Sequence, residues 1–186
     1  MVERERHDLR RTSTPFAIVS FSAGTINRCA LANPADIYLE TLAEVLMTRE
    51  ARLMSGIILI TVPTIQYGGY FLLTQLMNRS SGYMDNPLRQ NFFRAGHAHA
   101  GVIVILSLVC QVLADSAALS QPVTWLVRIG VPLAAILLPL GFFLSVTSPT
   151  AAEPNGLVGL IYAGAIVLAA SVLTLGVGLI RAALQT

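Results

Sequence analysis

Four long apolar segments follow one another along most of the chain. They cover residues 53–77, 93–114, 123–146 and 156–184. A helix needs about 20 apolar residues to cross the ~30 Å hydrocarbon core of a bilayer, and each segment reaches that length. No segment alternates apolar and polar residues as a membrane β-strand does. The pattern therefore predicts an all-α integral membrane protein with four spanning helices.

The connections between these segments are short and contain turn-forming residues. Residues 78–92, 115–122 and 147–155 include several pairs that combine Gly, Pro, Asn or Ser. Short connections make successive helices antiparallel neighbours. We therefore expect a four-helix antiparallel bundle.

The beginning of the chain has a different character. We divide the sequence into an N-terminal extension, residues 1–50, and a four-span transmembrane domain, residues 51–186. The extension mixes arginines with acids and is expected to be poorly ordered, apart from a short amphipathic helix that starts at Asn33 and Pro34. A translation start at Met47 is an alternative interpretation of this extension.

The composition supports a membrane protein and argues against a soluble one. The chain is 54% hydrophobic and 12% charged, whereas soluble domains carry about 25% charged residues. This balance makes the lipid bilayer the expected partner and argues against nucleic acid. The two cysteines, Cys29 and Cys110, form no Cys-x-x-Cys pair, so they support neither a zinc site nor a disulfide framework.

The arginines predict an orientation in the membrane. Four lie at the end shared by both termini and the second connection: Arg49, Arg52, Arg128 and Arg181. Three lie at the opposite end: Arg79, Arg89 and Arg94. Because positive charge accumulates on the cytoplasmic side, we expect a multi-pass protein of the bacterial inner membrane with both termini in the cytoplasm.

Two histidines near the start of the second apolar segment form the clearest candidate site. His97 and His99 are the only histidines in the spanning segments, and ionisable residues inside a span mark functional sites by default. The alternative is a pair that is simply hydrated at the membrane surface. In a regular helix the two point about 200° apart. His97 shares a small, polar face and should point toward other helices, whereas His99 shares an apolar face and should point toward lipid or a partner subunit.

Matching the depths of the four spans places this candidate site in the outer half of the bundle. We expect residues from all four spans to surround His97, with Arg94 offering its guanidinium to an anionic group. The candidate cofactor-binding residues are His97, Arg94, Gly101, Tyr67, Tyr70, Thr74, Phe142, Gly159 and Tyr162. The candidate metal ligands are His97 and His99; a single ion could use both only if the backbone is irregular there.

The run from Gly96 to His99, preceded by Tyr67-Gly68-Gly69-Tyr70-Phe71, resembles the first helices of the haem-copper oxidase catalytic subunit. It also resembles small bacterial four-helix membrane proteins with His-x-His at the head of helix two. The resemblance covers about residues 53–114 and implies that a histidine here ligates haem near the outer face. The later segments contain no histidine, so a bis-His haem would need a ligand from a second copy or another subunit.

Three functions are compatible with these observations. The first is a protein that binds haem or a transition metal through histidine, such as an accessory subunit of a respiratory complex. The second is a structural or assembly protein without a cofactor, and the third is a small transporter. The sequence has no hydrolase motif and no paired carboxylates within a span, which disfavours enzymatic activity in the isolated chain.

Overall fold

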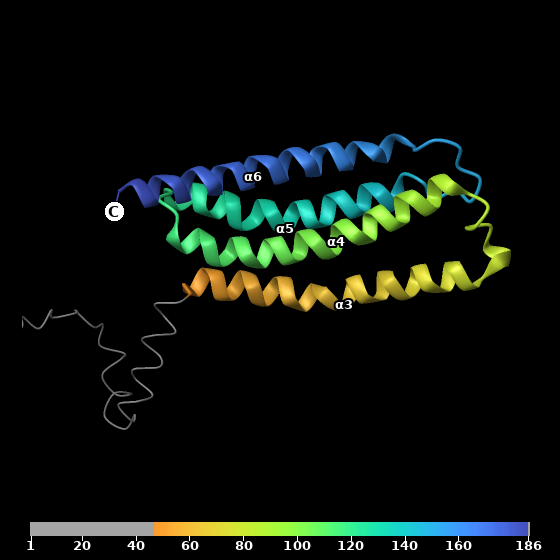
Figure 1. The fold of residues 1–186 in the computed structure, drawn as a ribbon, viewed down its shortest axis with the longest axis horizontal. Coiled ribbons are helices and arrows are strands. Elements are labelled where there is room, and N and C mark those ends of the chain that lie inside the picture. The colour runs from red at the N-terminus through yellow and green to blue at the C-terminus, as the bar shows by residue number, and fades with distance from the viewer. Residues whose placement is uncertain (1–46, 186) are drawn as a thin grey trace, which may run out of the picture. The chain divides into compact units, whose positions relative to one another are not determined.

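The computed structural model describes residues 47–185, and this part of the chain is all helical (Figure 1). The rest, which includes the predicted amphipathic helix and most of the N-terminal extension, lies outside the described residues. The four long helices are α3 (Arg49–Met77), α4 (Pro87–Leu113), α5 (Gln121–Leu144) and α6 (Gly159–Leu184). Single 3-10 turns are η1 (Arg79–Ser81), η2 (Ala114–Ser116) and η3 (Gly156–Val158). All four helices are long and apolar enough to cross a membrane, as predicted.

The helix bounds lie within about one turn of the predicted spans, except that α4 begins earlier than predicted. The sequence pattern placed Asn86 and Pro87 in a connection, but α4 begins at Pro87, well before the apolar run starts at Phe93. The Asn86 side chain accepts a hydrogen bond from Arg89 N at 3.1 Å, so it caps the helix. Pro87 then suits the first turn, where no N–H donor is needed.

Helix α5 is the centre of the bundle. The main apolar core consists of buried residues on its inner faces together with residues from α4 and α6, including Val131, Leu138, Ile103 and Leu175. Glycines on α5 allow α6 to come close: a Cβ added to Gly141 would lie only 2.7 Å from Ile161 N. Such small-residue contacts are the usual way in which membrane helices pack against each other.

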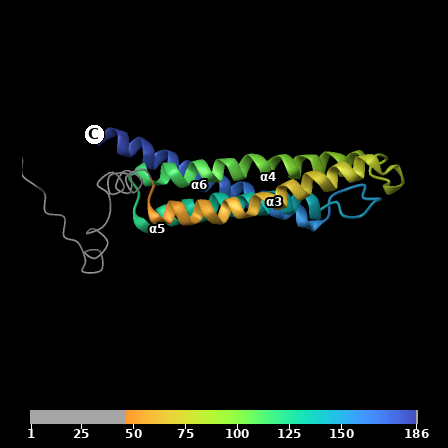
Figure 2. The same cartoon turned by 90° about the horizontal axis from the view of Figure 1, so that it is seen from below.

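Helix α3 lies at one edge of the bundle, beside α4 (Figure 1). Only Ala51, Ile58 and Leu72 are buried among its 29 residues. Leu72 joins a second apolar cluster with Tyr83 and Phe93 at the end of the bundle where α3 turns into α4. Figure 2 shows that this end also carries the α5–α6 connection, opposite the C-terminus, as a four-span topology requires.

Candidate functional site

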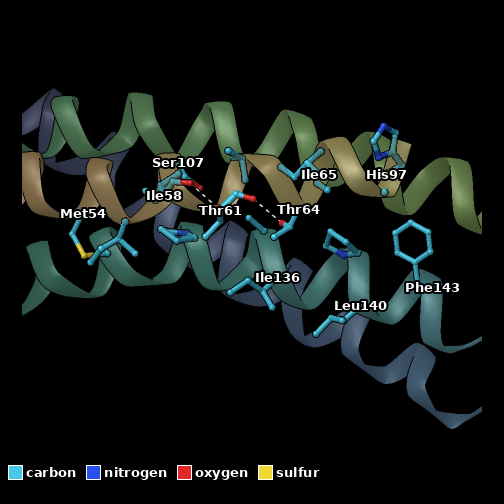
Figure 3. Close-up of a pocket in the computed structure, with 17 residues that line it drawn as sticks. Met54, Ile58, Thr61, Thr64, Ile65, His97, Ser107, Ile136, Leu140 and Phe143 are labelled. Carbon is cyan, nitrogen blue, oxygen red and sulfur yellow. Dashed lines mark hydrogen bonds between the residues drawn. The ribbon is translucent and has the colours of Figure 1, made fainter. Parts of the chain in front are cut away.

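A long groove runs between α3 on one side and α4 and α5 on the other (Figure 3). Its volume is about 390 Å³. On α3 the lining residues extend from Met54 to Gly68, which corresponds to about 21 Å along the helix axis at 1.5 Å per residue. We call this cavity the α3 groove. Met54 lies at one end, and His97 and Phe143 lie at the other.

The hydroxyl groups in the wall of the α3 groove donate to the backbone of their own helices. Thr61 donates to Ile58 O at 2.6 Å, and Thr64 donates to Thr61 O at 2.7 Å. Ser107 on α4 donates to Ile103 O at 2.7 Å. Because these protons are already used, the wall offers mainly methyl and methylene groups to anything that enters.

Unlike these hydroxyl groups, the His97 side chain is a polar group of the groove wall that does not bond to the backbone of its own helix. Its ring packs against α3 where the chain has two successive glycines: a Cβ added to Gly69 would lie 3.3 Å from Cε1 and Nε2 of His97, and one added to Gly68 would lie 3.5 Å from Nδ1. Within residues 47–185 the His97 ring forms no hydrogen bond. The glycine pair thus makes room for an imidazole that is half-buried, lines the groove and has no hydrogen-bond partner among the described residues.

The structure separates the two histidines. His99 is exposed, its ring packs on Phe142 with centroids 5.0 Å apart, and it does not line the α3 groove. Its Nδ1 lies 2.7 Å from Ala95 O, and because a carbonyl only accepts, Nδ1 carries the proton. In the described part of the chain no group of three His, Cys, Asp or Glu side chains is placed to hold a metal ion.

The predicted aromatic residues do not gather around His97. Tyr67, Tyr70 and Tyr162 are 70%, 63% and 66% exposed and point away from the bundle. On α3 the tyrosines share a face with Pro63, and the opposite face, with Ile58 and its neighbours, packs inward. The nine expected residues therefore do not form one cavity.

The remaining predicted residues are also dispersed. Thr74 donates to Phe71 O at 2.6 Å on its own helix. Gly101 and Gly159 have no neighbouring side chain within 4 Å of an added Cβ. Phe142 packs against Gly96, and the exposed Arg94 donates to Gln90 Oε1 at 3.5 Å and also interacts with the Tyr83 phenol. Of the expected set, only His97 lines the α3 groove.

A second polar centre, which we call the inner clasp, lies at the end of the bundle that carries the C-terminus. Arg128 is buried and forms an ion pair with Asp115. Its Nη1 donates to Gln111 O at 2.9 Å, and Gln111 Nε2 donates back to Arg128 O at 2.9 Å. Thr48 joins the start of α3 to this pair, because its hydroxyl and its N–H both donate to the Asp115 carboxylate, at 2.7 and 3.0 Å.

The sequence pattern missed the inner clasp, although a signal for it was present. The sequence pattern assigned Arg128 only to the predicted orientation in the membrane, and it assigned Asp115 only to the second connection. Opposite charges at the facing ends of antiparallel neighbours are close enough to pair, and burial of an arginine requires such a partner. Every buried side-chain N and O atom among residues 47–185 has a hydrogen-bond partner. The inner clasp therefore holds the start of α3 against the adjoining ends of α4 and α5 and leaves no polar group unpaired.

The opposite end of the bundle contains a second buried arginine. Arg89 Nε donates to Val146 O at 3.1 Å, and its guanidinium lies 5.1 Å above the centre of the Phe93 ring. Tyr83 is buried beside it, and this burial raises the pKa of its phenol, while Arg94 and Arg89 lower it by a smaller amount. Tyr83 is therefore neutral at physiological pH and packs as an aromatic residue of the second cluster.

Comparisons with protein-family models, with curated proteins and with solved structures find no match for this chain.

Proposed function

We propose that this protein binds an elongated apolar molecule from the bilayer, with its chain in the α3 groove and a single polar head group at His97. The observation that carries this proposal is the His97 ring, which has no hydrogen-bond partner among the described residues and stands at the end of an otherwise apolar cavity. A polar group without a partner in an apolar environment costs about 1–3 kcal/mol. A head group that accepts from or donates to the imidazole removes this cost.

The head group, more than the chain, decides what binds. Lipid tails are as apolar as the groove wall, so moving a chain from the bilayer into the groove gains little hydrophobic free energy. The length of the groove selects a linear chain, and His97 selects the chemistry of its end. This division of roles fits binding sites in general, which combine an apolar wall with a few placed polar groups.

Haem, which the sequence resemblance implies, is a second candidate ligand of His97 and an alternative to the elongated molecule. Among residues 47–185 only one histidine lines the groove, so the chain would supply a single axial ligand and a second subunit would supply any other. The imidazole of His97 is the observation that favours this candidate. A Soret band that disappears in His97→Ala would support it.

The test compares two histidine variants that differ in position but not in chemistry. The full chain is purified from membranes in mild detergent, and bound molecules are extracted and identified by mass spectrometry alongside an absorption spectrum. We expect His97→Ala to lose at least tenfold of the bound molecule and His99→Ala to retain it, because His99 lies outside the groove. Equal retention in both variants, or no bound molecule in the unmodified chain, would refute the proposal and favour a structural role.

A second variant tests the groove without altering His97. Ala100 lines the groove one turn along α4 from the histidine, so Ala100→Phe should fill the cavity and exclude the ligand chain. We expect the bound molecule to be lost while the helix content in circular dichroism stays the same. Retention of the molecule would show that it binds elsewhere.

We further propose that the chain lies in a bacterial inner membrane with the inner clasp on the cytoplasmic side. Arg49, Arg52 and Arg181 are exposed at that end and supply the positive charge. Arg128 contributes less than the sequence suggests, because Asp115 neutralises it.

A further inference from the structure

One face of α3 is both polar and turned away from the other helices. Gln66, Tyr67 and Tyr70 are exposed on it, and Pro63 lies between them. At 100° per residue these four fall within an arc of about 100°. We call this surface the outward α3 face; it is opposite the residues that line the α3 groove.

The amide of Gln66 makes this face unfavourable in contact with lipid. Gln66 lies near the middle of the 29-residue α3, so its amide falls within the hydrocarbon when the helix crosses a membrane. The amide offers two donors and one acceptor, and it uses none of them within residues 47–185. Pro63 lies on the same face and has no N–H, so it cannot donate to Leu59 O as a helical residue usually does. Lipid chains offer no hydrogen-bond partner to the Gln66 amide.

We propose that the outward α3 face binds the same face of a second copy of this chain. Copies inserted in the same orientation place their α3 helices parallel, so that equivalent residues meet at the interface. An amide is self-complementary, because the N–H of one Gln66 can donate to the Oε1 of the other. Tyr67 and Tyr70 then pack around the amide pair and shield it from lipid.

This interface is independent of the ligand proposed for His97. The groove and the outward α3 face lie on opposite sides of the helix, so the dimer leaves the groove open. Loss of the dimer should not remove the bound molecule, and loss of the molecule should not dissociate the dimer.

The first test measures association of the full chain in liposomes by energy transfer between labelled copies, as a function of the protein-to-lipid ratio. Interhelical hydrogen bonds in membranes contribute modestly, so we expect Gln66→Leu to weaken association roughly three- to thirtyfold. Gln121→Leu is the matched control, because Gln121 is an exposed glutamine at the start of α5 and should leave association unchanged. A monomer at all ratios, or equal association of both variants, would overturn the proposal.

The second test locates the interface. In a chain with Cys29→Ser and Cys110→Ala, a single Tyr70→Cys on the outward α3 face should cross-link two copies by oxidation. Ile166 on α6 is slightly more exposed than Tyr70, at 70% against 63%, and Ile166→Cys should not cross-link. Cross-linking through position 166 in preference to position 70 would place the contact on another helix and refute the assignment.

Discussion

At the scale of single residues, the inner clasp shows how this chain buries charge. Arg128 and Asp115 are held by each other, by Gln111 and by Thr48, so neither charge is left without a partner. A buried pair of this kind adds little net stability over apolar residues, but removal of one partner leaves the other charge uncompensated. The importance of the pair is therefore visible only when it is broken.

We expect Asp115→Ala to destabilise the protein by about 3 kcal/mol, toward the lower end of the range for buried pairs, because the Asp115 side chain is 14% exposed and water reaches it. Thermal unfolding in detergent measures this loss. Glu153→Ala is the control, since Glu153 is an exposed acid in the α5–α6 connection and its removal should change little.

A double variant separates charge burial from simple loss of contacts. Arg128→Met combined with Asp115→Leu removes both charges, so it should unfold at a higher temperature than Asp115→Ala alone. A double variant that is less stable than the single one would show that the ion pair itself stabilises the fold.

At the scale of elements, helix α5 organises the bundle and α3 is attached to its edge. The contact between α5 and α6 depends on backbone approach at Gly141, where an added Cβ would meet the backbone of Ile161. By contrast α3 buries only three residues and leaves a groove along its middle. The candidate site thus lies where the closely packed helices α4 and α5 face the loosely packed helix α3.

Glycine substitutions test this division. Gly141→Ala should destabilise the protein by about 1–3 kcal/mol, because α5 and α6 must move apart to admit a methyl group. Gly176→Ala on α6 has nothing within 4 Å of the new Cβ and should be neutral or stabilising by up to about 1 kcal/mol, since alanine favours a helix. Unfolding curves that rank the two variants in the opposite order would contradict the packing.

At the scale of the whole molecule, four spans place the α3–α4 and α5–α6 connections on one side and the α4–α5 connection on the other. In the cysteine-free background, Ser148→Cys and Ser116→Cys introduce exposed thiols in the α5–α6 and α4–α5 connections. We expect an impermeant thiol reagent to label position 148 from outside intact cells and position 116 only after the membrane is opened. Labelling of both positions from the same side would exclude four spans.

The sequence by itself determined the four long apolar helices of residues 47–185 and, apart from the start of α4, their bounds to within about one turn. A spanning helix is specified locally, by about 20 successive apolar residues, so the four segments could be located without knowledge of their neighbours. The cap at Asn86 is also visible in the sequence, but the apolar run alone predicts that the helix begins later, at Phe93. The sequence pattern also placed His97 on a face that points toward other helices, because small and polar residues mark helix contacts, and its ring packs against Gly68 and Gly69 of α3.

Only the tertiary structure decided which face of α3 points inward and which charges pair. In a membrane protein the lipid is as apolar as the core, so hydrophobic periodicity does not separate the buried face from the exposed one. Tyr67 and Tyr70 were expected to surround His97, but the two glycines beside Tyr67 contact the imidazole instead, and both tyrosines are exposed. The pairing of Arg128 with Asp115 likewise depends on how two helix ends meet, and that is a property of the packed bundle.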